Sequence, residues 1–151
     1  MAAARFPLLV LCLLPIIVCS VVDAELTHLH FYFHEVDAGT PNATVVNVAS
    51  LHRGGPASRL IGRAHGLAVH ASLDETGGLT AINFVFSDYG AYSGSTLATQ
   101  GHFITTGPSE RSIVGGTGKL RFARGYMTSK LLSSTDTAIV VVFDMYFTLD
   151  H

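Results

Sequence analysis

Apolar side chains recur at every second position in one segment of this chain after another, and this alternation constrains the fold more than any other feature. In residues 26–36, Leu29, Phe31 and Phe33 fall on one face of an extended chain. Successive side chains of a β-strand point to opposite faces, so a period of two predicts strands. Further strands are expected at 43–51, 59–71, 79–87, 95–106, 111–114, 119–130 and 137–149.

Short turns rich in glycine, asparagine and aspartate separate these segments, and no amphipathic helical stretch of useful length interrupts them. Seven or eight strands with turns at short intervals predict an all-β sandwich or barrel. In the last segment, 137–149, both faces are largely apolar. Such a strand fits a barrel that is filled inside and packed outside against another subunit, or the core strand of a sandwich.

The first 24 residues differ from the rest. Arg5 precedes an almost entirely apolar run over 7–22, and small residues follow at 22–24. This pattern predicts a secretory signal peptide over 1–24 and one β domain over 25–151. A membrane anchor is the alternative, but the apolar run is short for a span and Pro15 interrupts it.

Both cysteines, Cys12 and Cys19, lie in the predicted signal peptide, so the remaining domain has no disulfide. Its core, or assembly with other copies, must then hold it together. Asn42-Ala43-Thr44 is a sequon for N-glycosylation, which the secretory route makes accessible.

Two charged residues fall on apolar strand faces and are candidates for chemistry. Arg124 is an even number of positions from Leu120, Phe122 and Tyr126, so it is expected on the same strand face as these residues. Glu35 is expected on the same face as the phenylalanines of 26–36 for the same reason. A buried charge is costly without a partner, so these residues predict either a site or a buried ion pair. For Glu35, the end of a strand is an equally good explanation, because parity there no longer means burial.

Several function classes find no support. The net charge is −2 and the chain has no basic patch, which excludes nucleic-acid binding of the usual kind. No nucleophile-elbow motif frames a serine. His28, His30 and His34 share a strand face without a cysteine or acidic ligand, so no metal site and no cofactor are predicted.

Four blocks of sequence resemble the plant dirigent family and occur in the family's order. They are Phe-Tyr-Phe-His-Glu at 31–35, Ser-Arg-Leu-Ile-Gly-Arg-Ala-His-Gly-Leu at 58–67, the pair at 82–86 and 92–97, and the glycine-rich turn and strand at 114–126. Together they span nearly the whole predicted domain, although no single block is decisive.

The resemblance implies an antiparallel eight-stranded β-barrel, assembled as a homotrimer or homodimer in the plant extracellular space (the apoplast). Such proteins have no oxidase activity of their own. A laccase or peroxidase makes phenoxy radicals from monolignols such as coniferyl alcohol, and the pocket makes their coupling stereoselective, as in lignan formation. The resemblance gives Glu35 the place of the pocket carboxylate, Tyr92 that of a phenolic donor and Arg124 that of an oxyanion-stabilising group. Apolar lining is expected from Phe33, Phe84 and Phe122.

Some positions depart from the family pattern. The connection over 51–57 is short, which predicts a shortened strand or pocket rim and a more open barrel. Glu35 stands where aspartate is usual, and Lys119 where some coupling members are acidic. These departures keep a second function open, that of a non-catalytic secreted barrel that binds small aromatic ligands in defence.

Overall fold

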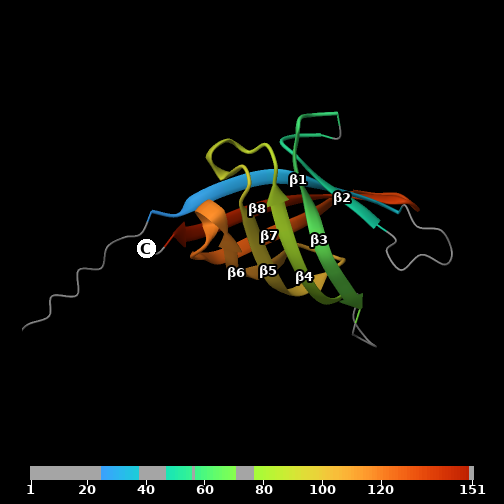
Figure 1. The fold of residues 1–151 in the computed structure, drawn as a ribbon. Coiled ribbons are helices and arrows are strands. Elements are labelled where there is room, and N and C mark those ends of the chain that lie inside the picture. The colour runs from blue at the N-terminus through green and yellow to red at the C-terminus, as the bar shows by residue number, and fades with distance from the viewer. Residues whose placement is uncertain (1–24, 38–46, 56, 71–76, 150–151) are drawn as a thin grey trace, which may run out of the picture.

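The computed structural model describes residues 25–37, 47–55, 57–70 and 77–149, which form a closed antiparallel barrel of eight strands (Figure 1). Each strand pairs with the next along the chain, and β8 pairs with β1 to close the barrel. The prediction of an all-β antiparallel barrel is confirmed. The strands are β1 (Thr27–Asp37), β2 (Asn47–His52), β3 (Leu60–His70), β4 (Gly77–Phe86), β5 (Thr96–Ile104), β6 (Ser109–Thr117), β7 (Ala123–Ser134) and β8 (Ala138–Leu149).

Two single turns of 3-10 helix, η1 (Gly90–Tyr92) and η2 (Gly118–Leu120), follow β4 and β6. No helix in the described ranges is long and apolar enough to cross a membrane. The predicted signal peptide over 1–24 and the sequon at Asn42 lie outside the described residues.

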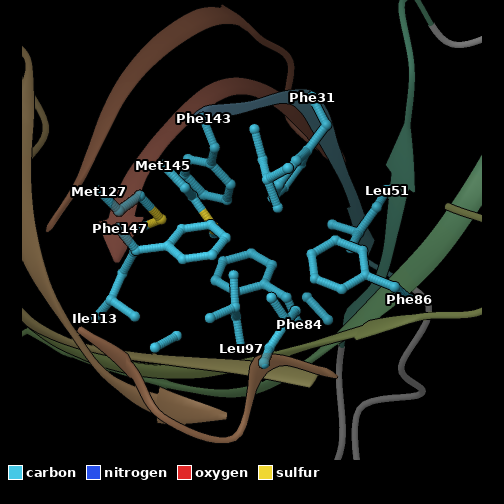
Figure 2. Packing of buried hydrophobic residues seen from close by; sticks show 14 of the residues in the cluster. Phe31, Leu51, Phe84, Phe86, Leu97, Ile113, Met127, Phe143, Met145 and Phe147 are labelled. Atoms are coloured by element: carbon cyan, nitrogen blue, oxygen red, sulfur yellow. The ribbon is translucent and has the colours of Figure 1, made fainter. Parts of the chain in front are cut away.

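Aromatic rings fill the barrel, and Phe31 lies among them (Figure 2). Its ring centroid is 5.6 Å from that of Phe84, 5.9 Å from that of Phe86 and 5.9 Å from that of Phe143, all edge to face. Edge-to-face pairs bring the positive ring edge to the negative ring face and add to the burial of apolar area. The apolar side chains that alternate along the sequence therefore point into this core.

Strand β2 has only six residues, yet the barrel closes, so the prediction of a more open barrel is wrong. The short strand suffices because it pairs with β1 on one edge and β3 on the other, and a bulge after Leu51 bends it. Leu51 is fully buried and fills the wall at this point. The following turn is closed by a hydrogen bond of 2.8 Å from the Gly54 N–H to Ser58 Oγ.

The glycine-rich segment before β7 changes the register of that strand. The turn η2 buries Leu120 completely, and Arg121 keeps helical dihedrals, so β7 starts only at Ala123. A shift of one residue exchanges the two faces of a strand. The prediction that Leu120 shares a face with Phe122, Arg124 and Tyr126 is wrong, because Leu120 is buried whereas the other three are exposed together. The inner face of β7 carries Ala123, Gly125, Met127 and Ser129.

Candidate functional site

A cavity of about 480 Å³ opens at the end of the barrel where η1 lies. Leu29 from β1 and Ile61 from β3, both buried, form its apolar floor. Polar and aromatic groups from the loops stand around this floor, so the cavity offers more hydrogen-bonding groups than the mostly apolar lining of a typical small-molecule site. These groups are Arg53, Arg59, Asp88, Tyr89, Tyr92 and Ser93.

Backbone hydrogen bonds fix the loop that carries the two tyrosines. The Gly94 N–H donates to the Phe86 carbonyl at 2.8 Å, and the Ser87 N–H donates to the Ile61 carbonyl at 2.9 Å. Gly90 and Gly94 have φ values of 58° and 80°, a left-handed conformation that other residues adopt only at a cost. The loop therefore presents its tyrosines from a defined backbone.

Aromatic stacking orients these tyrosines further. The Tyr89 ring stacks on buried Phe86 with centroids 5.3 Å apart, and the Tyr92 ring lies 6.5 Å from that of Tyr89. Burial raises the pKa of the Tyr89 phenol above its ordinary value, with Arg53 acting in the opposite direction. Tyr89 therefore stays protonated at neutral pH and remains a hydrogen-bond donor.

An ion pair stands at the rim of the cavity. The Arg59 guanidinium donates to both carboxylate oxygens of Asp88, with Nε 2.7 Å from Oδ2. Hydrogen bonding from Arg59 holds the pKa of Asp88 below its ordinary value. Because both groups are exposed, the pair contributes little to stability, and its effect is to fix the rim.

The three residues that the resemblance assigns to catalysis do not come together. Tyr92 lines the cavity. Glu35 lies near the end of β1, opposite Ala49 of β2 and Ile139 of β8. Strand β1 starts at the cavity end of the barrel, so Glu35 lies toward the opposite end.

Arg124 lies outside the barrel. Its Nη1 donates to the carbonyl oxygens of Val114 and Ala123, at 2.8 and 2.9 Å, and its side chain is exposed. Phe122 is 54% exposed. The prediction that these two side chains face a buried pocket is wrong, because η2 shifts the alternation that the prediction used.

Phe33 and Phe84 lie inside the barrel as predicted, but they pack in the core. Their rings contact that of Phe143 at centroid distances of 5.2 and 5.3 Å. Neither residue lines the cavity beside η1. They support the barrel from within, and their assignment to substrate binding stays a prediction.

Arg111 is a buried cation that the sequence did not reveal. It is 7% exposed, and its Nη2 donates to Ser129 Oγ at 2.6 Å. Its guanidinium carbon lies 5.8 Å from the centroid of the Phe143 ring. Burial lowers its pKa to about 10, so it stays charged at neutral pH. One signal for its burial was present in the sequence: Arg111 lies two residues before apolar Ile113, so both are on the same face of β6. The strand predicted at 111–114 began at Arg111 itself.

Comparison with known proteins identifies a family that matches most of the barrel. Residues 51–148 match the family model described as dirigent-like protein. The chain belongs to the dirigent family. Pterocarpan synthase 1 of Glycyrrhiza echinata, a relative of this dirigent protein, is 35% identical over 148 residues, covering 82% of this chain and 78% of the relative.

Other dirigent proteins are similar over comparable lengths. Dirigent protein 11 of Arabidopsis thaliana is 34% identical over 143 residues, covering 81% of this chain and 74% of that protein. The solved pterocarpan synthase dirigent protein PsPTS1 superposes with a TM-score of 0.70 at 32% identity, covering 84% of this chain and 97% of that chain. The eight-stranded barrel is therefore the family's fold.

Proposed function

We propose that this dirigent protein directs the stereochemistry of coupling between phenoxy radicals derived from monolignols such as coniferyl alcohol, in lignan and wider phenylpropanoid biosynthesis. The observation that carries the proposal is the cavity beside η1, where tyrosines and arginines stand over an apolar floor in a member of this family. The protein acts as an auxiliary. A laccase or peroxidase removes one electron and one proton from each phenol, and two radicals then pair their electrons in one new carbon–carbon bond.

Fixing the two radical faces before they meet is what makes such a coupling selective. Ligand pockets measure about 300–1,000 Å³, and the cavity of about 480 Å³ lies in this range. In the proposed complex, Leu29 and Ile61 support an aromatic ring. The Tyr92 hydroxyl donates a hydrogen bond to a phenoxy oxygen, which fixes the orientation of the ring.

The positions of the charged groups change their proposed roles. Arg53 lines the cavity, so it takes the oxyanion-stabilising role that the resemblance gives to Arg124. Glu35, toward the other end of the barrel, has no role in this proposal. Tyr92 is the residue of the predicted set that keeps its role.

A second candidate rests on the relatives named pterocarpan synthase 1, which are 35% and 33% identical to this chain. It is acid-assisted closure of a quinone methide, a step that the resemblance associates with some family members. The phenolic hydroxyls of Tyr89 and Tyr92, which line the cavity, would supply the proton in this step. A barrel that only binds small aromatic ligands is the remaining outcome.

The proposed function includes a location and an assembly. Residues 1–24 support secretion to the apoplast, and the sequon at Asn42 supports glycosylation there. A homotrimer or homodimer fits the apolar outer face of β8, where Val140 and Val142 are only half-buried by the chain itself.

The test measures the enantiomeric excess of coupled product when coniferyl alcohol is oxidised by a laccase with and without the protein. We expect an excess with the protein and a loss of most of it in Tyr92→Phe. Tyr126→Phe, on the outer wall, is the matched control and should keep the selectivity. Racemic product from several monolignols, with ligand binding intact, would leave only the binding role. Turnover of a quinone methide precursor without laccase would favour the second candidate.

A further inference from the structure

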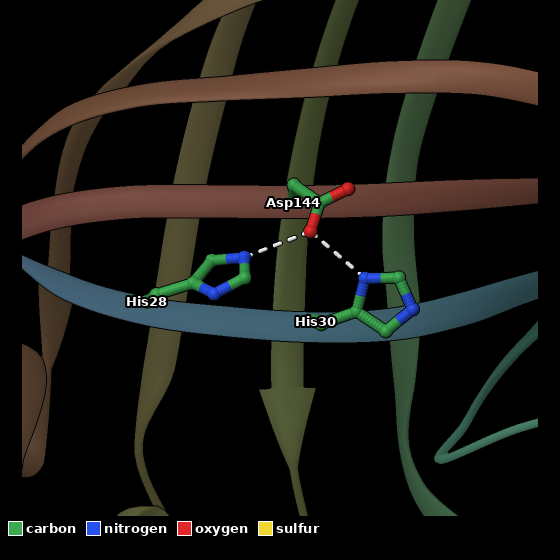
Figure 3. Close-up of polar contacts among 3 residues, drawn as sticks. All are labelled: His28, His30 and Asp144. Atoms are coloured by element: carbon green, nitrogen blue, oxygen red, sulfur yellow. Dashed lines mark hydrogen bonds and ion pairs between the residues drawn. The ribbon is translucent and has the colours of Figure 1, made fainter.

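Three potential metal ligands converge on the outer wall of the barrel, across the seam between β1 and β8 (Figure 3). His28 Nε2 and His30 Nδ1 each lie 2.8 Å from the same oxygen, Oδ1 of Asp144. The three atoms lie within 4.8 Å of one another. His28 and His30 share the outer face of β1, and Asp144 is the direct partner of His30 in β8.

The sequence predicts no metal site here, because the segment with the histidines offers no acidic ligand on the same face. The acid comes instead from β8, 114 residues further along the chain from His30. Only the closing of the barrel, which pairs the first strand with the last, brings the third ligand into place.

Aromatic neighbours hold the two imidazoles in position. The His28 ring stacks across the seam on Tyr146 of β8, with centroids 4.5 Å apart and planes at 4°. Tyr146 in turn stacks on Tyr126 of β7, with centroids 5.1 Å apart. The His30 ring meets Tyr32 edge to face at 5.4 Å. Ligands fixed by rigid strands and packed rings lose little entropy when an ion binds, which favours affinity.

The cluster is open to solvent, so an ion can reach it. The side chains of His28, His30 and Asp144 are 46%, 44% and 27% exposed.

We propose that His28, His30 and Asp144 form a binding site for a divalent transition-metal ion, with Zn²⁺ and Cu²⁺ the best candidates. Imidazole nitrogens with one carboxylate oxygen are ligands that both ions accept, and three protein ligands leave coordination positions for water. The site does not depend on the radical-coupling function, because its ligands face outward while Leu29, between the two histidines, faces the cavity.

Binding requires the three ligand atoms to become evenly spaced. Ligand atoms on one tetrahedral Zn²⁺ at about 2.0–2.2 Å lie roughly 3.3–3.6 Å apart. Each nitrogen must therefore move less than about 1 Å away from Oδ1, and the two nitrogens, which lie within 4.8 Å of each other, must reach the same spacing. Each imidazole offers a lone pair to the ion when the ring nitrogen nearest Asp144 carries no proton.

Cross-strand hydrogen bonds that merely strengthen the β1–β8 seam are the competing explanation. Calorimetric titration of the whole, untagged protein with Zn²⁺, and electron paramagnetic resonance with Cu²⁺, separate the two. We expect saturable binding of one ion per chain, with nitrogen hyperfine structure for Cu²⁺. Asp144→Asn, which keeps the shape and one acceptor oxygen, should weaken binding at least about tenfold.

His30→Gln provides a second variant in case Asp144→Asn fails to fold, and it should weaken binding similarly. His65→Gln, which removes another exposed outer-wall histidine on β3, is the matched control and should bind as the unmodified protein does. Absence of saturable binding at millimolar metal overturns the proposal. So does binding that His30→Gln leaves unchanged while the variant remains folded.

Discussion

Arg111 and Arg124 lie on neighbouring strands, β6 and β7, and occupy opposite sides of the same wall. Arg111 is sealed inside, with one hydrogen bond to Ser129 and a pKa lowered to about 10 by burial. Arg124 lies outside and hydrogen-bonds backbone carbonyls in contact with water. The side of the barrel wall on which an arginine lies therefore decides the free-energy cost of its charge more than the residue type does. Among the described residues, the inner wall holds the guanidinium of Arg111 beside an aromatic ring, whereas exposed charged side chains lie on the outer wall.

The largest expected difference between the two walls concerns phenylalanine. Phe84, fully buried, contacts the rings of Phe31 and Phe143, whereas Phe122 is 54% exposed. Phe84→Ala should lower the free energy of unfolding by about 3–5 kcal/mol, because it removes buried area and leaves a cavity. Phe122→Ala should change it by about 0.5 kcal/mol or less. Urea unfolding measures both, and equal losses would break the distinction between the walls.

The next difference concerns the two arginines themselves. Among the described residues, Arg111 Nε has no hydrogen-bond partner, so the buried guanidinium is incompletely satisfied. Arg111→Met should raise the free energy of unfolding by about 1–2 kcal/mol, since an apolar side chain of similar length removes the desolvation cost. Arg124→Met should stay within about 0.5 kcal/mol of the unmodified protein.

Guanidinium chloride unfolding of both methionine variants checks this prediction. Because the chain has no tryptophan, the unfolding is followed by far-ultraviolet circular dichroism. A loss of stability in Arg111→Met larger than that in Arg124→Met would contradict it. Such a loss would mean that the cation, through Ser129 and the Phe143 ring, stabilises the barrel more than its burial costs.

The smallest expected effect concerns His34, an outer-wall residue that is nevertheless buried. It is 8% exposed, and its ring lies 4.8 Å from that of His52. Burial first, and repulsion from His52 second, lower the pKa of His34 below 6.5. The unfolded chain therefore binds more protons than the folded protein in this range, and stability should fall as pH drops below about 6.5.

Urea midpoints at about pH 7.5 and about pH 5.5 test this sign. His34→Gln should flatten the dependence, whereas His65→Gln, at an exposed site, should leave it unchanged. The lowered pKa of Asp144 acts only below its ordinary value of 3.8 and so does not enter this window. A midpoint that rises on acidification would contradict the assignment to His34.

The sequence predicts the strands well because burial on one face leaves a period of two in each segment. The last segment, expected at 137–149, is observed at Ala138–Leu149, and the first, expected at 26–36, at Thr27–Asp37. The prediction fails at 119–130, where the glycine-rich turn holds one turn of 3-10 helix. Local alternation carries no information on such an offset, and one residue reverses every side chain that follows.

The candidate site was less predictable than the fold. Tyr92 was found through the resemblance, but Arg53, Arg59 and Tyr89 carry no pattern that marks them as neighbours. They come from separate turns that meet only because the barrel brings its loops to one end. Glu35 and Arg124 were expected to join Tyr92. Glu35 instead lies toward the opposite end of the barrel, and Arg124 points outward from β7.

The sequence alone therefore determined the all-β class, the approximate positions of most strands and the family, because these depend on local alternation and on short blocks of residues. Tertiary structure alone decided which arginine is buried, which side chains surround the cavity and which carboxylate meets His28 and His30. The physical reason is that closing the barrel joins β1 to β8 and fixes inward and outward faces by register. Register is a property of strand pairs, which no single segment of sequence contains.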